Sequence, residues 1–537
     1  MRACLSCFAI LCSSLLVPVL DDAVAAPFAD HGGAELSVDG PVLAPIRHKP
    51  MWINERDQFG YNPRYPAAPV TFGPDNRPYI WDGDELVTLN EEGRWISLEV
   101  VQKVQAKYGG IAGGPGANDP FLGFDADGDA YLLVRLILER QDVFRDSAPQ
   151  RVDAFGFLHS GDGMQSWTFV ETHPVSWYSA TGPLPRKLYL GPGRLEHWQP
   201  NSQVTGPPPM VEGRGRELAL YLPQKNEDGS MGPVKRLVVA GVKPPVVGKG
   251  RNWITPLHSG AGNVSATYGG RTHVVWLSIQ PHEWHKEQVE ALSAEMQGPY
   301  VPYALRYKDG LDALAPQYIR TYDHATGELG PRVLLGFSRR DNHDGPVIGV
   351  DSKGYLHVIL GAHHDNFQYT RSLEPNSATG GWTEPIMFGT PRPAKGGGSY
   401  TYQAMVIDRE DVIHLVSRSA ANSGYYFNLA YNRKKPGSDW EPEVVLVHPF
   451  RPGYCAWRQK LTTDRLGRLF LSYAHYPSEL TGEQKAAYHR KYPQFKGGIR
   501  ETGHTVLMSD DGGDSWRLAL TGDFVEGWRR GKEGTGN

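Results

Sequence analysis

The sequence contains very little cysteine. Of its 4 cysteines in 537 residues, Cys4, Cys7 and Cys12 lie close to the N-terminus, within a segment that resembles an export signal. Removal of that segment leaves Cys455 alone, so the mature chain is expected to have no intrachain disulfide. Its fold then depends on the hydrophobic core.

The sequence also lacks long apolar runs and an excess of one charge. The apolar stretch at residues 4–20 is too short to span a bilayer comfortably, and no later stretch is long or apolar enough. The formal net charge is −4, or −3 without residues 1–25, which argues against a basic nucleic-acid surface. We therefore expect no nucleic-acid partner and, after signal cleavage, no membrane association. Local arginines and lysines would hold any anionic ligand.

The N-terminus has the features of a secretory signal peptide. Arg2 precedes the apolar stretch, and Ala23 and Ala25 supply small residues at the −3 and −1 positions. Cleavage after Ala25 would leave an N-terminal extension at residues 26–66. The sequence thus predicts a secreted or periplasmic protein.

The composition favours β structure. Counts of 62 Gly, 42 Pro, 14 Trp and 26 Tyr indicate many turns and many aromatic strand positions. Helical patterns are few. Residues His285–Met296 and Glu483–Lys491 are predicted as short helices in insertions between strands.

One pattern recurs along the chain: a strand, then Asp-x-x-Gly or a polar substitute, then an apolar strand. Its copies are FDADGDAYLLV from Phe124, VDSKGYLHVIL from Val350, IDREDVIHLVS from Ile407 and TDRLGRLFLSY from Thr463, with a looser TFGPDNRPYIW from Thr71. The last three strong copies are spaced by 57 and 56 residues. Each copy predicts a hairpin, because Asp and Gly suit tight turns.

A second motif supports the same architecture. Ser509–Trp516 reads SDDGGDSW and matches the Asp-box hairpin of sialidase-like propellers, whereas Ser160–Trp167 reads SGDGMQSW, with its glycine one place early. Hairpin units begin near residues 67, 114, 188, 256, 343, 400 and 455. We predict an all-β fold, a single seven-bladed β-propeller over residues 67–520 with short helical insertions and a C-terminal tail at 521–537. Two β-sandwich domains fit less well, since the spacing is regular and no Pro/Ser linker divides the chain.

Four residues stand out by their register in neighbouring repeats. His343 lies eight residues before Asp351, and His363 follows the next strand. Tyr402 lies six residues before Asp408, and Arg418 ends the following strand. Because innermost strands of a propeller converge on a central funnel, these side chains are expected to meet there.

These four residue types suit β-elimination next to a uronic acid. The reaction needs a group that neutralises the carboxylate, a base for the C5 proton and an acid for the leaving O4. Arginine pairs with both carboxylate oxygens, histidine is a base near neutral pH, and tyrosine donates or accepts the proton. No cofactor is required for this chemistry. Singly, each residue also has a structural interpretation, as a core side chain or an inter-blade ion pair; their joint placement favours function.

The runs DNHDGPVIGVDSKGYLHVILGAHHDNFQYTRS and SYTYQAMVIDREDVIHLVSRS resemble the BNR-4 repeat proteins, over roughly residues 340–435. That group includes seven-bladed ulvan lyases and related lyases or rhamnosidases. The resemblance implies that His343, His363, Tyr402 and Arg418 are catalytic, with Arg418 neutralising the uronate, Tyr402 as acid or as acid and base, and a histidine as base for the other epimer. Two departures stand out: about 300 residues precede these blades, and Gln403 replaces a proline common among relatives.

Further positions are expected to contact the substrate. Arg458 lies six residues before Asp464, as Tyr402 does before Asp408, so it should face the same funnel. Tyr454 and Lys460 are neighbours of Arg458, and His258 and Asn263 belong to the blade before the histidines. For each of them an inter-blade contact is the alternative.

The predicted function is cleavage of a uronic-acid-containing polysaccharide by a monomeric lyase. A sulfated, ulvan-like polysaccharide is the first substrate to test. A glycoside hydrolase of the rhamnosidase or sialidase type and a non-catalytic carbohydrate-binding propeller are the alternatives. The sequence does not decide whether the protein binds a structural calcium or zinc ion. Cys455 with His475 or His504 fits no strong zinc-ligand spacing.

Overall fold

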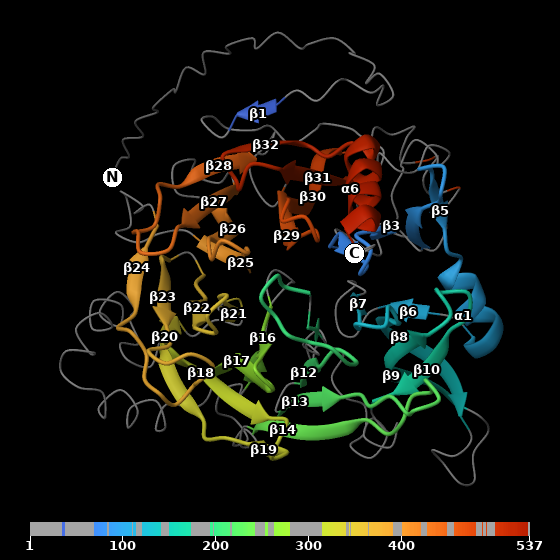
Figure 1. Cartoon of the computed structure of the whole chain (residues 1–537), viewed down its shortest axis with the longest axis horizontal. Coiled ribbons are helices and arrows are strands. Elements are labelled where there is room, and N and C mark those ends of the chain that lie inside the picture. Colours follow the sequence, from blue (N-terminus) through green and yellow to red (C-terminus); the bar gives the residue numbers. More distant parts are fainter. Residues whose placement is uncertain are drawn as a thin grey trace, which may run out of the picture.

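The computed structural model is a ring of seven antiparallel β-sheets (Figure 1). This ring confirms the predicted seven-bladed propeller and excludes two β-sandwich domains. The structure describes residues 35–37, 69–82, 85–109, 111–113, 121–140, 150–172, 194–196, 198–214, 217–241, 253–255, 263–279, 314–339, 343, 345–363, 365–389, 400–419, 427–447, 456–479, 486, 490 and 500–534. The predicted signal peptide and the predicted helix at 285–296 lie outside the described residues, as do most of 26–66 and of 483–491.

The first four blades use strands in chain order. Blade 1 contains β2 (Thr71–Phe72), β3 (Pro78–Asp82), β4 (Glu85–Leu89) and β5 (Trp95–Ser97). Blade 2 contains β6 (Ile111–Gly113), β7 (Leu122–Phe124), β8 (Ala130–Arg140), β9 (Gln150–Ser160) and β10 (Thr168–Glu171). Blade 3 contains β11 (Arg194–Leu195), β12 (Met210–Arg214), β13 (Glu217–Leu222) and β14 (Lys235–Gly241). Blade 4 contains β15 (Trp253–Thr255), β16 (Ser265–Tyr268), β17 (Arg271–Ile279), β18 (Leu314–Asp323), β19 (Glu328–Leu329) and β20 (Val333–Arg339).

The last three blades are more regular. Blade 5 contains β21 (Val347–Val350), β22 (Leu356–Leu360), β23 (Phe367–Arg371) and β24 (Ile386–Phe388). Blade 6 contains β25 (Tyr400–Ile407), β26 (Ile413–Ser419), β27 (Asn428–Lys434) and β28 (Val444–Val447). Blade 7 contains β29 (Ala456–Thr463), β30 (Leu469–Glu479), β31 (Arg500–Ser509) and β32 (Ser515–Leu518), and β1 (Glu35–Ser37) pairs with β32 at its outer edge. The blades begin close to the positions predicted from the hairpin count.

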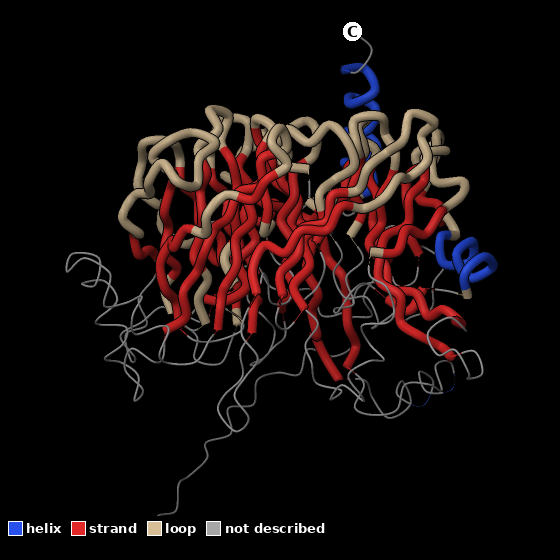
Figure 2. Tube along the Cα trace, turned by 90° about the horizontal axis from the view of Figure 1, so that it is seen from below, coloured by secondary structure: helices blue, strands red, loops and turns tan. Residues whose placement is uncertain are grey.

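The four Asp-x-x-Gly turns form as predicted, between the innermost strand of a blade and the next. The Oδ1 atom of each turn aspartate accepts hydrogen bonds of 2.8–3.0 Å from the backbone N–H groups two and four positions later. The fourth residue of each turn has a positive φ, near 88° for Gly354 and 63° for Asp411. The described turns and loops gather at one end of the strands (Figure 2). We call this end the turn end, and the opposite end the site end.

Both Asp-box sequences fold into the same hairpin. Ser160 and Ser509 donate from Oγ to the aspartate two positions later, at 2.8 Å in each case. Met164 (φ 68°) adopts the left-handed backbone that Gly513 (φ 90°) adopts in the full motif. The near-match at Ser160 is therefore a complete Asp-box in three dimensions, despite its displaced glycine.

A C-terminal helix covers the seam between the first and last blades. Helix α6 (Thr521–Gly534), within the segment expected to be a tail, places Phe524 against Trp95 of blade 1 (5.5 Å between ring centroids) and Phe470 of blade 7 (5.3 Å). Trp528 donates from Nε1 to Asp75 at 2.9 Å. The other described helix, α1 (Val100–Tyr108), follows blade 1. The ring is thus closed by side-chain packing and by α6.

A loop of blade 3 crosses the middle of the ring at the turn end. It consists of Glu196 and residues 198–205, between β11 and β12. Asn201, for example, donates from Nδ2 to two main-chain carbonyls, at 3.2 and 3.0 Å. The loop contacts Ala126 of blade 2, Thr267 of blade 4, Val350 of blade 5, Asp408 of blade 6 and Arg465 of blade 7. This one loop of blade 3 therefore contacts five other blades.

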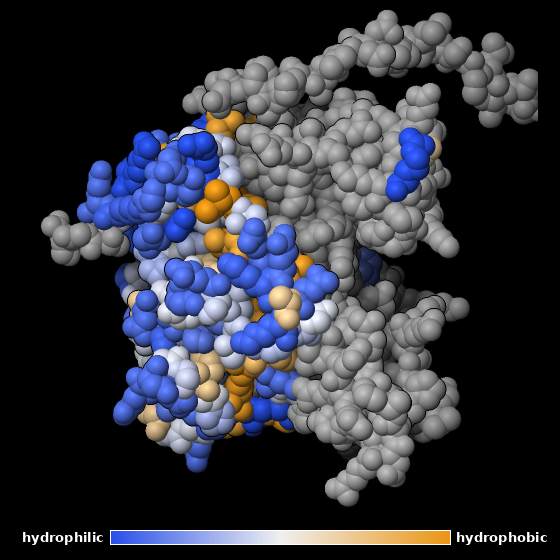
Figure 3. Space-filling model, turned by 90° about the vertical axis from the view of Figure 1, so that its right-hand side faces the viewer, coloured by the Kyte–Doolittle hydropathy of each residue, from blue (hydrophilic) through white to orange (hydrophobic). Residues whose placement is uncertain are grey.

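The described surface is mainly hydrophilic on the side that carries α1, with apolar residues in narrow strips (Figure 3). The large side chains of the blades are buried between neighbouring sheets, as Trp276 and Trp516 illustrate. No helix in the described part of the chain is long and apolar enough to cross a membrane.

Candidate active site

The structure brings the four predicted site residues together at the site end of blades 5 and 6. His343 precedes β21 and His363 follows β22, so both lie at the opposite end from the Asp351 turn. Tyr402 lies near the start of β25, and Arg418 lies near the end of β26. Antiparallel pairing of β25 with β26 places Thr401 opposite Arg418. The register argument from sequence thus led to a real cluster.

The aromatic rings of the cluster are in contact. The imidazoles of His343 and His363 have centroids 4.4 Å apart and an interplanar angle of 32°. The phenol ring of Tyr402 lies 5.6 Å from the His343 ring and is turned by 64°, an edge-on arrangement. Both histidines are partly exposed, whereas Tyr402 is 5% exposed. The imidazoles are therefore the accessible part of the cluster.

Arg418 lies beneath these rings. Its side chain is fully buried, and its guanidinium carbon lies 4.5 Å from the ring centroid of Tyr402 and 4.5 Å from that of Phe427. A cation between two aromatic faces is attracted by both ring quadrupoles, and the attraction strengthens as water is removed. The sequence predicted the arginine but not Phe427. The positive charge is thereby held directly against Tyr402.

The backbone at Tyr402 is strained. Its φ is 61°, in the left-handed region that a bulky aromatic residue rarely occupies. The register of β25 against β26 shifts between Thr401 and Ala404, which is the mark of a β-bulge. Such a conformation costs on the order of 1–3 kcal/mol and persists only where the surroundings enforce it. The bulge turns Tyr402 out of the regular alternation of the strand and aims it at the histidines.

Three buried glutamines hold the backbone near the candidate residues. Gln459 of blade 7 donates from Nε2 to the carbonyl of Tyr402 itself. Gln403 of blade 6 donates to the carbonyl of Gly345, two residues after His343. Gln317 of blade 4 bonds both the N–H (3.1 Å) and the carbonyl (3.5 Å) of Gly361, two residues before His363. Each of these bonds crosses between blades, so the site geometry depends on the ring.

The sequence analysis missed these glutamines, although it contained a signal for two of them. Gln403 and Gln459 both lie five residues before a turn aspartate, in TYQAMVID and WRQKLTTD. Gln403 is also the residue that departs from the proline of many BNR-4 relatives. Its hydrogen bond to Gly345 gives that departure a structural role.

The remaining predicted contacts are only partly visible. The β29–β30 register shifts between Trp457 and Lys460, as it does after Thr401 in β25, so Arg458 has the same place in the strand register as Tyr402. The side chain of Arg458 lies outside the described residues, as do Tyr454 and His258. Lys460 and Asn263 are buried, and the Asn263 carbonyl accepts a bond from the backbone N–H of Ile348 at 2.9 Å. Substrate contact by these five residues stays a prediction.

A different set of histidines lies at the turn end of the same blades. Each of them hydrogen-bonds a turn aspartate through Nε2 and a tyrosine hydroxyl through Nδ1. In blade 5 the three residues are Asp351, His357 and Tyr369, and in blade 6 they are Asp408, His414 and Tyr431. Both ring nitrogens are thus occupied, and His357 and His414 pack within their blades.

Among the described residues, no group of three or more His, Cys, Asp or Glu side chains is arranged to hold a metal ion. The side chains of Cys455, His475 and His504 lie outside the described residues. The four candidate site residues offer imidazole, phenol and guanidinium groups.

Comparison with known families supports the resemblance found in the sequence. The model of a BNR repeat-containing family member matches residues 308–475 of this chain. That range contains all four candidate site residues and the blades that carry them. No curated protein sequence matches the chain significantly.

Several solved structures resemble the chain at low identity. An ulvan lyase described as a new polysaccharide lyase family has 14% identity and a TM-score of 0.32, with 51% of this chain and 59% of that one covered. An α-L-arabinanase of Penicillium chrysogenum, complexed with arabinobiose, has 11% identity and a TM-score of 0.35, with 66% and 88% covered. A protein of unknown function from Dyadobacter fermentans has 12% identity and a TM-score of 0.35, with 86% and 96% covered. The chain thus spans about three fifths of the length of the ulvan lyase that it matches.

Proposed function

We propose that this protein is a polysaccharide lyase that cleaves a uronic-acid-containing polysaccharide by β-elimination. The observation that carries the proposal is the contact of His343, His363 and Tyr402 above the buried charge of Arg418. The cluster contains a base, a proton donor and a fixed cation within one site, and β-elimination needs these three. It is exported in this proposal, and it works as a monomer.

In the proposed reaction a base removes the C5 proton of the uronate, the C4–O4 bond breaks, and a C4–C5 double bond forms. Either histidine accepts the proton, because imidazole is a base near neutral pH and both rings are partly exposed. The Tyr402 hydroxyl protonates the departing O4, which leaves as the hydroxyl of the shortened chain. For the opposite epimer at C5, Tyr402 both accepts and returns the proton.

Arg418 supplies positive charge where negative charge develops. Removal of the C5 proton moves charge onto the uronate carboxylate, and a preorganised cation stabilises that charge better than water does. Because the guanidinium is buried between two rings, its direction is set before the substrate arrives. In this proposal it acts on the carboxylate and on Tyr402 together.

The test is to incubate the protein with ulvan, glucuronan, gum arabic and glycosaminoglycans and to follow ultraviolet absorbance. Elimination leaves an unsaturated uronate that absorbs, whereas hydrolysis gives reducing ends without absorbance. His343→Ala is expected to lower the rate at least about hundredfold, as removal of a general base does. Binding of the same polysaccharide should persist in this variant.

The alternative functions predict different results in this assay. New reducing ends without absorbance would assign the site to a glycoside hydrolase of the rhamnosidase or sialidase type. Binding without any cleavage by the wild type would make the protein a carbohydrate-binding propeller. Cleavage that His343→Ala, His363→Ala and Tyr402→Phe each leave unchanged would move the chemistry away from this cluster.

A further inference from the structure

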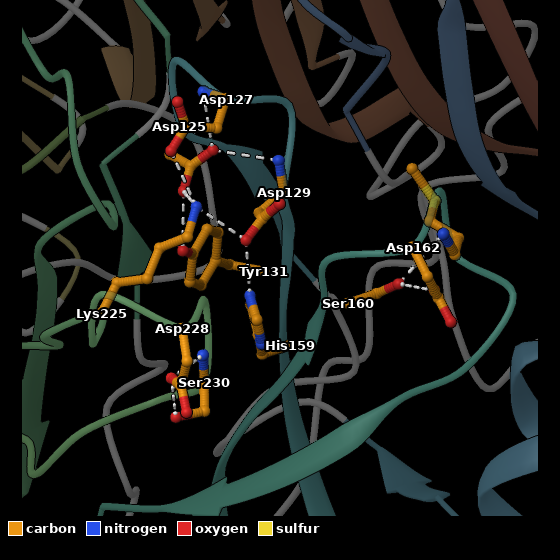
Figure 4. A network of polar contacts seen from close by, with 11 residues as sticks. Asp125, Asp127, Asp129, Tyr131, His159, Ser160, Asp162, Lys225, Asp228 and Ser230 are labelled. Carbon is orange, nitrogen blue, oxygen red and sulfur yellow. Dashed lines mark hydrogen bonds and ion pairs between the residues drawn. The ribbon is translucent and has the colours of Figure 1, made fainter.

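A lysine and three aspartates fill the turn end of the junction between blades 2 and 3 (Figure 4). The Nζ atom of Lys225, in the loop after β13, lies 3.2 Å from Asp125, 2.9 Å from Asp127 and 2.8 Å from Asp129. Asp129 also contacts His159 at 2.9 Å. Although burial acts in the opposite direction, the hydrogen bonds to the three carboxylates raise the pKa of Lys225. The positive charge of Lys225 is thus compensated by carboxylates of the chain itself.

The junction between blades 5 and 6 has the same framework. Lys225 lies three residues after the third strand of blade 3, and Lys434 is the last residue of the third strand of blade 6. Both form an isolated bridge with the residue six positions later. The turn that each lysine approaches begins with an aspartate bonded to the second and fourth N–H groups after it. Lys434 is therefore the structural equivalent of Lys225.

The residues around the second lysine are different. By register from the turn aspartate, Lys353 replaces Asp127 and Tyr355 replaces Asp129. Arg371 pairs with His357 in the sheet where His159 pairs with Tyr131, so Arg371 replaces His159. Two acidic groups are lost and two cations are gained. The charged positions that both junctions share are the turn aspartate and the lysine of the following blade.

The carboxylates that remain at junction 5/6 are already bonded. Asp351 accepts from two backbone N–H groups and lies 3.2 Å from the Nε2 atom of His357. Asp411 accepts from the backbone N–H and the hydroxyl of Ser352. Within the described part of the chain, no ion pair joins Lys353, Arg371 or Lys434 to a carboxylate. These three cations therefore lack the direct carboxylate contacts that Lys225 has.

A cavity of about 210 Å³ opens at this junction. Its lining includes the three cations and Lys435, the carboxylates of Asp351 and Asp411, and the rings of Tyr355 and Tyr369. Arg371 lies over the Tyr355 ring at 4.8 Å, and Lys434 lies over the Tyr369 ring at 5.7 Å. Burial lowers the pKa of Lys434, while the charge of Asp439 opposes this shift and that of Arg371 adds to it. The volume is below the roughly 300 Å³ of pockets for drug-sized ligands. There is space for one charged group and part of a sugar ring.

We propose that junction 5/6 binds an anionic group, a sulfate or a carboxylate, carried by an acidic polysaccharide. It lies at the end of the propeller opposite to the candidate active site and would hold the polymer at a second point. Arginine and lysine are the usual partners of such oxyanions, and both tyrosine faces offer a surface for the adjacent ring. The polysaccharide source rests on the proposed function, whereas the anion site itself rests on the charges.

The test compares binding to ulvan in native gels at low salt, in a Tyr402→Phe background so that the polymer is not cleaved. Arg371→Gln combined with Lys434→Gln is expected to weaken ulvan binding about tenfold, roughly 1.4 kcal/mol, with thermal unfolding unchanged. Lys225→Gln is the matched control at the equivalent position. It should lower the unfolding temperature, because it leaves three carboxylates without their cation, and should keep ulvan affinity.

Equal affinity of the double variant and its parent for ulvan would overturn the proposal. Desulfated ulvan distinguishes the two anions. If the parent and the double variant bind desulfated ulvan equally well, the site binds sulfate. If the parent still binds it more tightly, the site binds carboxylate. Inorganic sulfate that saturates the site and is not displaced by ulvan would overturn the polysaccharide source. If no polysaccharide is cleaved by the wild type while Arg371 and Lys434 still govern binding, the lyase function fails and the anion site stands.

Discussion

The two ends of blades 5 and 6 use the same residue types for opposite purposes. At the turn end, His357 and His414 are buried, and an aspartate and a tyrosine occupy their two ring nitrogens. At the site end, His343 and His363 stack on each other and stay partly exposed, beside a tyrosine with a strained backbone. A fully hydrogen-bonded histidine stabilises the fold, whereas an accessible one is available for proton transfer. The surroundings decide which role a histidine has.

The largest expected effect is a difference in elimination rate between variants of Tyr402, at the site end, and Tyr431, at the turn end. Tyr402→Phe is expected to lower the elimination rate at least about hundredfold, because it removes the proton donor, with little change in thermal unfolding. Tyr431→Phe should do the reverse, since it removes the hydroxyl bonded to His414 at 2.7 Å and costs about 1 kcal/mol of stability. Initial rates and melting curves of both variants check the pair. A Tyr402→Phe enzyme with nearly full activity would refute the site.

The next effect is a loss of folding stability at low pH, caused by the buried histidines of the turn end. His273 of blade 4 is fully buried, with bonds of 2.8 Å to Thr321 and 2.9 Å to Asn376, and burial lowers its pKa to about 4. Between pH 6.5 and 4 the unfolded chain binds the extra proton, so stability falls as the pH falls, by on the order of 3 kcal/mol. Burial lowers the pKa of His357 as well, in the same direction.

Urea unfolding at pH 7, 6 and 5 of the wild type and His273→Gln measures this loss. The variant should lose less stability on acidification than the wild type. Burial raises the pKa of Glu196, which opposes the loss above about pH 4.5. Because both proteins contain Glu196, the difference between them isolates His273, and parallel losses would contradict the prediction.

A smaller effect is expected from the turn-end histidine of blade 6. His414→Ala leaves Asp408 and Tyr431 without a buried partner, which costs about 1–3 kcal/mol. Elimination activity below the unfolding temperature should be retained. If His414→Ala abolished activity in a folded protein, the division of labour between the two ends would be wrong.

The smallest effect concerns the glutamine that holds Tyr402. Gln459→Leu removes the bond to the Tyr402 carbonyl and is expected to lower kcat about tenfold, since a small misplacement of a catalytic group weakens the reaction. KM should stay the same, because Gln459 positions Tyr402 and does not bind substrate. Gln368→Leu is the control, since Gln368 makes a similar bond between blades, to the carbonyl of Phe337 (2.8 Å), which is not one of the candidate site residues. Equal losses of kcat in both variants would make the role of Gln459 merely structural.

Much of the fold and the core of the site could be predicted from the sequence. The Asp-x-x-Gly turns were readable because their hydrogen bonds join residues two and four positions apart. The blades follow from the spacing of these turns, and His343, His363, Tyr402 and Arg418 follow from their register within the blades. The contacts of the blade 3 loop and the helix α6 were not predicted, because their partners lie in other blades and no local sequence pattern indicates them.

The sequence by itself determined the turns, the number of blades and which end of each strand carries the candidate residues, since all of these depend on neighbours along the chain. Only the tertiary structure decided how those residues are held. The burial of Arg418 between Tyr402 and Phe427, the glutamine bonds and the different charges of the two junctions all join different segments of the chain. Lys225 and Asp125, 100 residues apart, meet only because blade 3 packs against blade 2. Local hydrogen bonds shape each blade, whereas the packing of blade against blade determines what stands beside each functional group.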